Sequence, residues 1–247
     1  MYLLHRTALD TAAPQTDVWL PSVQVMIARE YPRYDCGLTL AAKGGHNNES
    51  HNHNDVGSFV VFDNGQPVFI DVGSGTYTAK TFSSERYTLW NVRSLYHNLP
   101  FFGEAEQHNG AQFAARAVSC TTDGKKSVLS MDIAGAYPNG AEKWEREISL
   151  DREKAEITVK DSFRLTSAER VGFTFMTQQK PELSGGRLIL GGGSLSREGF
   201  DGSVKTEKIT LEDETFKKSF GDSIYRTVFL SKEKMTAGAV KFVYKRG

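Results

Sequence analysis

The chain of 247 residues carries 30 Lys and Arg against 30 Asp and Glu, and 39% of its residues are apolar. This composition is that of a folded globular protein and excludes a long disordered chain. The balanced charge argues against a broad surface for nucleic acid or anionic membranes, because such surfaces depend on accumulated Lys and Arg. A local basic cleft for an acidic ligand remains compatible with it.

The two cysteines, Cys36 and Cys120, are too few for a disulfide framework, and their apolar surroundings favour free thiols. No apolar run approaches the roughly 18–20 residues that span a bilayer, so we expect no membrane contact. The first residues also lack the basic and then apolar pattern of a signal peptide. These features fit a cytosolic protein or one part of a longer chain.

Short segments with period-two alternation or apolar character recur along the chain, which is typical of β-strands. Turn residues separate them, and Asn64-Gly65 is the strongest signal, because both residues accept the positive φ angles of a two-residue hairpin turn. We predict an all-β protein, a single domain of residues 1–247 that forms a large antiparallel β-sandwich of about a dozen strands. The expected strands cover residues 23–29, 36–42, 57–62, 67–72, 112–119, 127–132, 143–150, 155–163, 170–177, 204–209, 224–230 and 239–244.

Residues 77–107 interrupt this pattern and show few strand signals. Long excursions inside a compact β domain are usually functional loops or cover the core. Their aromatic residues, among them Trp90 and the pair at 101–102, are expected to pack, because aromatic side chains in β proteins usually do.

Polar residues concentrate at 50–55, where the sequence reads Ser-His-Asn-His-Asn-Asp. Imidazoles must find partners when buried, so two histidines here are not typical of a core. In an extended segment His51 and His53 share one face and lie about 7 Å apart. This spacing suits two ligands of one metal, or one ligand beside a catalytic imidazole. A polar surface loop is the alternative.

A carboxylate follows the apolar residues 68–70 at Asp71, where it needs a partner, a turn to cap or a cation. Ideal hairpin pairing sets Asp71 opposite Ser58, which is about 16 Å from His53 along an ideal strand. Shared ligation by His53 and Asp71 therefore requires the chain to bend back near Gly57.

Three motifs resemble the heparinase II/III family of polysaccharide lyases. They are HNHNDVGSF at residues 51–59, DVGSGTY at 71–77 and YHN at 96–98. The resemblance implies the fold of that family's C-terminal β-sandwich domain. The family also carries an N-terminal α/α toroid, and this sequence shows no sustained run of amphipathic helices that would form one.

The resemblance also implies a site. In the family's H-x-H-x-D motif the first histidine is catalytic and the second binds metal, which assigns catalysis to His51 and metal binding to His53. The aspartate before the Val-Gly pair is Asp71, and the histidine before the asparagine is His97. The implied cofactor is zinc, held by His53, Asp71 and His97, and this mixed nitrogen and oxygen donor set suits zinc with water or another group completing it.

A lyase that acts on a uronic-acid polymer removes the proton at C5, expels the oxygen at C4 and neutralises the uronate carboxylate. A neutral histidine such as His51 accepts or relays a proton near neutral pH, because the unperturbed pKa of histidine is about 6.5. Arg86 and Arg93 lie beside His97 and are candidates for binding a carboxylate or sulfate. Asn98 is a third candidate for substrate contact. Surface salt bridges and turn capping are the alternative roles of these residues.

The partners that the resemblance implies are an anionic polysaccharide, of glycosaminoglycan or alginate type, and the missing toroid. In the family the toroid supplies a catalytic tyrosine and much of the cleft, so we expect the isolated chain to be weakly active or inactive. Family members work in the bacterial periplasm or outside the cell, and we expect the same of the full-length protein.

Two other functions stay open. A cupin-like metal enzyme would share Gly45 and the pair of histidines at 51 and 53, but the glutamate expected four or five residues later is replaced by Gly57 and Ser58. The second is a non-catalytic carbohydrate-binding or scaffold sandwich with a structural metal.

Overall fold

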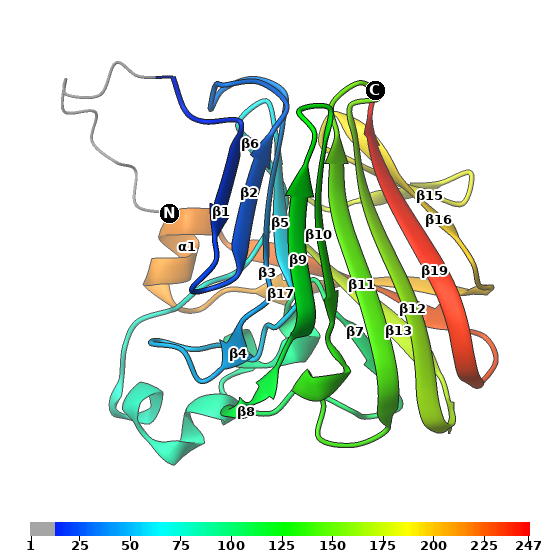
Figure 1. Cartoon of the computed structure of the whole chain (residues 1–247). Helices are drawn as coiled ribbons and strands as arrows, with labels where there is room; N and C mark the ends of the chain where they lie inside the picture. The colour runs from blue at the N-terminus through cyan, green and yellow to red at the C-terminus, as the bar shows by residue number, and fades with distance from the viewer. Residues whose placement is uncertain (1–12) are drawn as a thin grey trace.

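The structure is a computed structural model that describes residues 13–247 (Figure 1). Within this range the chain forms nineteen strands, five short 3-10 helices and one α-helix, α1 (Glu214–Phe220). The predicted all-β class is therefore confirmed, while residues 1–12 of the predicted domain lie outside the described range. None of the helices in residues 13–247 combines the length and hydropathy that a bilayer-spanning helix needs.

One layer of the sandwich consists of two sheets that meet edge to edge. Their contact is between β6 and β13, where the Ile70 N–H donates to the Met176 carbonyl at 2.9 Å. The five-stranded sheet has the order β1 (Asp17–Leu20), β2 (Val25–Arg29), β3 (Leu38–Lys43), β5 (Phe59–Asp63), β6 (Gln66–Phe69). The four-stranded sheet has the order β17 (Gly202–Thr210), β18 (Ser223–Ser231), β13 (Val171–Thr177), β7 (Pro100–Phe102).

The second layer is an eight-stranded sheet, whose long strands dominate Figure 1. All strand pairs in the described residues are antiparallel. The order is β14 (Glu182–Ser184), β15 (Arg187–Leu190), β16 (Gly193–Glu198), β19 (Met235–Arg246), β12 (Glu156–Glu169), β11 (Ala141–Asp151), β10 (Lys126–Asp132), β9 (Arg116–Thr122).

The strand number exceeds the expected dozen because several strands are too short to show an alternating pattern. The two-residue strand β4 (His46–Asn47), which pairs with β8 (Gly110–Ala114), and the three-residue strand β7 are examples. The longer strands show the alternation clearly, as β12 buries every second residue from Ile157 to Leu165. Period-two burial is what a strand with one face on a core requires.

Aromatic side chains from both layers meet in the core. Trp144 of β11 is fully buried, and its ring stacks on Phe163 of β12 with a centroid distance of 4.8 Å. Phe69 of β6 contacts Tyr244 of β19 across the two layers at 5.9 Å. Such contacts add to the free energy gained by removing large apolar surfaces from water.

The segment between β6 and β7 covers one end of the sandwich, beside β4 and β8 (Figure 1). It forms no strand and winds through consecutive 3-10 helices. Trp90 packs on Phe216 of α1 with a centroid distance of 5.7 Å, and Phe102 is buried, so both take the packing role expected of them. The helices are η1 (Ala79–Phe82), η2 (Ser84–Thr88), η3 (Trp90–Val92) and η4 (Ser94–Tyr96), and η5 (Ala134–Ala136) follows β10.

The β5–β6 hairpin departs from ideal pairing. Its turn at 64–65 has the predicted positive φ angles, 50° and 74°. Val61, however, pairs with Phe69, one residue away from the ideal register, because the strand contains a bulge. The predicted pairing of Asp71 with Ser58 is therefore wrong.

Residues 50–58 form turns, so the extended segment assumed for the histidines is also wrong. Gly57 has a φ of +87°, and its N–H donates to the Lys43 carbonyl at 3.0 Å. The Ser58 N–H donates to the Asp55 carbonyl at 3.0 Å. The chain thus bends back at Gly57, as shared ligation required, and glycine adopts this φ without strain.

We expect Gly57→Ala to destabilise the fold by more than Gly124→Ala. Both glycines have a positive φ, +87° and +83°, so each alanine meets a penalty of about 1–2 kcal/mol. A Cβ at residue 57 would also lie 3.0 Å from Ile133 Cγ2, whereas nothing lies within 4 Å of one at residue 124. This crowding adds about 1 kcal/mol or more. Urea unfolding measures both losses, and equal losses would show that Ile133 moves aside freely.

Candidate functional site

Three segments that are far apart in the sequence meet at the end of the sandwich below β5 and β6. His53 comes from the turns that precede β5, Asp71 follows β6, and His97 follows η4. One ligand atom of each lies within 4.8 Å of the others. The structure therefore brings together the three residues that the sequence predicted as metal ligands, although no two of them share an element.

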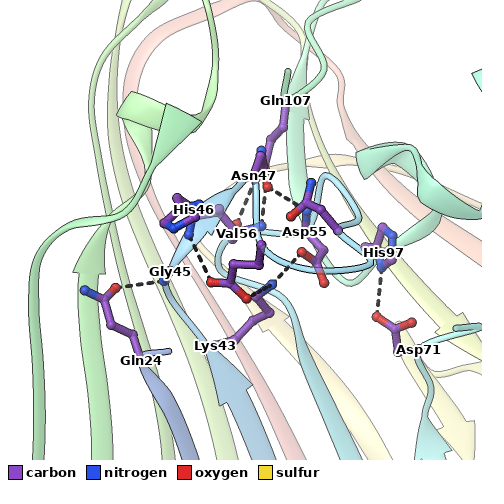
Figure 2. A network of polar contacts seen from close by, with 12 residues as sticks. Gln24, Lys43, Gly45, His46, Asn47, Asp55, Val56, Asp71, His97 and Gln107 are labelled. Carbon is purple, nitrogen blue, oxygen red and sulfur yellow. Dashed lines mark hydrogen bonds and ion pairs between the residues drawn. The ribbon is translucent and has the colours of Figure 1, made fainter. Parts of the chain in front are cut away.

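His97 and Asp71 form the tightest pair of this group, which Figure 2 shows joined by a dashed line. The distance from His97 Nδ1 to Asp71 Oδ2 is 2.9 Å. Nδ1 is the donor, because a carboxylate only accepts. The Gly73 N–H donates to Asp71 Oδ1 at 2.8 Å and completes the surroundings of the carboxylate.

The pKa values of this pair move in opposite directions. Burial alone would lower the pKa of His97, but the charge and hydrogen bond of Asp71 outweigh burial and raise it. Burial alone would raise the pKa of Asp71, but the charge and hydrogen bond of His97 hold it well below its usual range. Each partner thus stabilises the ionised form of the other.

His53 is in the opposite state. Burial, followed by repulsion from His97, lowers the pKa of His53 to about 4, so the ring is neutral near pH 7. Its centroid lies 5.3 Å from that of His97. Apart from Ser74 Oγ at 3.4 Å from Nε2, no hydrogen-bond partner of this ring is found among residues 13–247.

These residues fit a zinc ion. A neutral imidazole, a second imidazole and a carboxylate are the donors that zinc takes in proteins. His97 Nε2 is buried and has no hydrogen-bond partner within the described part of the chain, which is unusual for a polar atom in a core. His53, Asp71 and His97 would hold the ion and thereby tie three loops together.

His51 stands outside this group. It is exposed and has a φ of +57°, a left-handed conformation that is uncommon for residues other than glycine. The Tyr77 hydroxyl lies 3.1 Å from His51 Nδ1, and the two ring centroids are 5.6 Å apart. A strained backbone that presents an imidazole to solvent beside a phenol is typical of a functional site.

Tyr77 is a site residue that the sequence reasoning missed. It lies inside the motif at 71–77, but spacing alone does not show which side chain of that segment reaches His51. The Tyr77 ring contacts a second exposed aromatic residue, Phe82, with a centroid distance of 5.5 Å. Tyr77 and Asp71 both line a hollow of about 520 Å³ that α1 closes on one side.

The three predicted substrate-binding residues occupy different places. Arg93 lies at the surface, where its side chain is 39% exposed and forms a two-pronged ion pair with Glu106. Arg86 is buried, and its Nε and Nη2 donate to the Asn52 carbonyl at 3.0 and 2.9 Å. This geometry makes Arg86 a support of the histidine turn.

Asn98 lies beneath the candidate metal ligands, inside the sandwich, and is 1% exposed. Its Nδ2 donates to the carbonyls of Phe59 and Ile70 at 2.7 and 3.1 Å. Its Oδ1 accepts the Met176 N–H at 2.7 Å. The carboxamide thus joins three segments of backbone and does not face a ligand.

A polar network of hydrogen bonds and ion pairs also supports the turns at residues 50–58 (Figure 2). Gln107 is its centre, because its Nε2 donates to the Val56 carbonyl at 2.8 Å while its Oε1 accepts the Val56 N–H at 3.0 Å. The same Oε1 accepts Asn47 Nδ2 at 3.1 Å. Nearby, Lys43 pairs with Asp55 at 2.8 Å. The sequence reasoning singled out neither Gln107 nor Lys43.

In metal-free protein we expect the free energy of unfolding to fall as the pH falls from about 6.5 to 4. The pKa of His53 is about 4 in the folded state and about 6.5 in the unfolded chain, so the unfolded chain binds more protons in this window. The loss reaches up to about 3 kcal/mol, at about 1.4 kcal/mol per pKa unit. His97, whose pKa is raised, loses its contribution above this window, and Asp71, whose pKa is depressed, loses its contribution below it.

Urea unfolding with a chelator at several pH values measures this slope. The His53→Gln variant should flatten it, and the control His46→Gln should keep it. An unchanged slope in His53→Gln would show that another group titrates.

Comparison with known proteins identifies the family of this domain. A family model described as heparinase II/III-like, C-terminal, matches residues 32–236, well over half of the chain. No protein in the curated set matches.

Solved structures share the fold. A heparinase III with methylated lysines superposes with a TM-score of 0.72 at 14% identity, over 93% of this chain and 35% of that one. A heparan sulfate lyase, HepC from Pedobacter heparinus, gives 0.68 at 18% identity, over 94% of this chain and 37% of that one. The chain thus spans little more than a third of the length of these proteins. The matched residues and the shared fold together show that this chain belongs to the heparinase II/III-like C-terminal family.

Proposed function

We propose that this chain is the sandwich part of a polysaccharide lyase that cleaves uronic-acid-containing polymers by β-elimination. The observation that carries the proposal is the division of roles between two neighbouring histidines. His53 and His97 are buried and lie beside the half-buried Asp71, while His51 is exposed and paired with Tyr77. One cluster suits a bound zinc ion, and the other suits proton transfer at an open surface.

The reaction requires a base for the C5 proton and an acid for the oxygen that leaves C4. His51 and Tyr77 together supply a nitrogen and a phenol that share one hydrogen bond, so a proton can pass between them. Tyr77 also fixes the orientation of the imidazole, since its hydroxyl contacts Nδ1 and leaves Nε2 available to a substrate. A zinc ion bound by His53, Asp71 and His97 supplies a cross-link that holds the His51 turn in place.

The surroundings of His51 suit a sugar polymer. Tyr77 and Phe82 are 47% and 72% exposed and offer ring faces to the flat side of a pyranose. Of the two predicted arginines, Arg93 is the one at the surface, where a uronate carboxylate or a sulfate can reach it by displacing Glu106. We assign Arg86 and Asn98 to positioning instead, because their donors are used by backbone carbonyls.

We propose that an α/α toroid completes the cleft, and that the full-length protein works in the periplasm or outside the cell. The coverage of only 35–37% of the solved lyases supports the first point, because those chains hold much more than a sandwich. Glycosaminoglycans and alginate are the substrate classes that the uronate chemistry admits.

Zinc binding tests the ligand assignment. We expect the purified chain to bind one zinc ion per molecule, and His53→Ala, Asp71→Ala and His97→Ala each to lose it, because each removes one donor of the cluster. His108→Ala is the control, since His108 is exposed and stands outside the cluster. Metal analysis after dialysis measures the stoichiometry. Zinc that survives all three changes would reject the assignment.

Formation of unsaturated uronate tests the reaction. On heparan sulfate, chondroitin, hyaluronan and alginate we expect little or no turnover by the chain alone, and clear turnover once it is joined to a toroid domain. In the joined protein His51→Ala should lower kcat by about 10²- to 10⁴-fold, because it removes the proton-transfer group.

The His108→Ala variant should keep full turnover in the same assay. Rapid release of unsaturated products by the isolated chain would show that no second domain is needed. Full activity of His51→Ala would overturn the role of His51.

A further inference from the structure

Beneath the candidate site an arginine occupies a position where the strand pattern calls for an apolar residue. The inward-facing residues of β11 include Trp144, Arg146 and Ile148, and Arg146 is 3% exposed. Its cross-strand partner on β12 is Asp161, which is 2% exposed and interrupts a row of buried apolar residues in the same way. A buried ion pair is a weak source of stability, because desolvation offsets its attraction and an apolar pair is often as stable.

The pair is held rigidly. Arg146 Nε and Nη2 donate to the two oxygens of Asp161 at 2.8 and 3.0 Å. Trp144 Nε1 donates to the same carboxylate at 2.7 Å. These bonds fix the plane of the guanidinium and leave Nη1 directed away from Asp161.

Nη1 joins the two segments that carry the histidine ligands. It donates to the carbonyls of Gly57 and Asn98, both at 3.0 Å. Gly57 stands four residues after His53, and Asn98 directly follows His97. A single nitrogen from the eight-stranded sheet therefore sets the distance between these two turns.

The third ligand segment is tied to the same point. The Asn98 side chain donates to the carbonyl of Ile70, the residue before Asp71, at 3.1 Å. The same Asn98 Nδ2 donates to the carbonyl of Phe59, the first residue of β5, at 2.7 Å. All three ligand segments thus meet at Asn98, whose own backbone carbonyl is held by Arg146.

We propose that Arg146, fixed by Asp161, is a positioning residue that sets the spacing of His53, Asp71 and His97. The inference rests on the proposed function, because this spacing matters only if the three side chains share an ion. Arginine suits the task, since its planar fork makes several hydrogen bonds in fixed directions whereas lysine offers one point charge.

The test measures zinc affinity in the full chain with Arg146→Met combined with Asp161→Asn. Methionine fills the space without charge, and asparagine keeps an acceptor for Trp144, so no charge is left buried and unpaired. We expect the double variant to fold and its zinc affinity to fall by about 10- to 100-fold, which is the loss seen when residues that hydrogen-bond to metal ligands are removed. Competition with a chelating dye measures this affinity. The absorption spectrum of bound cobalt should also change, because the ligand geometry relaxes.

The matched control is Arg246→Met combined with Glu30→Gln. This pair also makes two hydrogen bonds, at 2.8 and 2.9 Å, and joins the two layers. It lies at the end of β19 near the C-terminus, at the opposite end of the sandwich from the segment between β6 and β7 (Figure 1). We expect it to lower the melting temperature and to leave the zinc affinity and the cobalt spectrum unchanged.

Each outcome decides a separate point. A folded Arg146 variant that binds zinc as tightly as the natural chain overturns the positioning role and leaves the ligand assignment intact. A natural chain that binds no zinc overturns the ligand assignment, and the positioning role with it. If the double variant does not fold, Arg146→Lys keeps the buried charge beside Asp161 and removes the bridge between the carbonyls, so it must show the same loss of affinity.

Discussion

The candidate site depends on a small group of hydrogen bonds that join three separate pieces of backbone beneath it. The Asn98 carboxamide binds the backbone that precedes Asp71 and the start of β5, and Arg146 binds the carbonyls of Gly57 and Asn98. The carbonyls of Gly57 and Asn98 lie in turns, outside the strands. Because buried carbonyls need donors, the side chains that supply them also determine where the ligands stand.

The electrostatics of the three ligands follow from this placement. His97 and Asp71 lie close enough that each favours the ionised form of the other, whereas burial lowers the pKa of the neighbouring His53. The cluster therefore combines a hydrogen-bonded His97–Asp71 pair with an imidazole, His53, that is neutral near pH 7. Such a cluster suits a cation, which His97 Nε2 can bind while Nδ1 keeps its hydrogen bond to Asp71.

Burial separates the two histidines to which we assign different roles. The two residues are only two positions apart in the sequence, yet His53 lies inside the cluster and His51 is exposed, with a left-handed φ of +57°. Tyr77 then reaches His51 from the segment after Asp71. The candidate metal ligand Asp71 and Tyr77, the proposed partner in proton transfer, thus come from one loop, so holding one of them also places the other.

The sequence by itself determined the class of fold, because period-two alternation is visible in each strand without knowing which strand pairs with it. It also determined the hairpin turn at 64–65, which depends only on local φ preferences. Its motifs also singled out His53, Asp71 and His97. Only the tertiary structure decided that these three converge, that His51 turns outward to Tyr77, and that Arg146 and Asn98 lie beneath them. Spacing along the chain predicts only which side chains are neighbours within one strand. The contacts of the candidate site join different strands and turns. Their relative positions follow from the packing of the two layers.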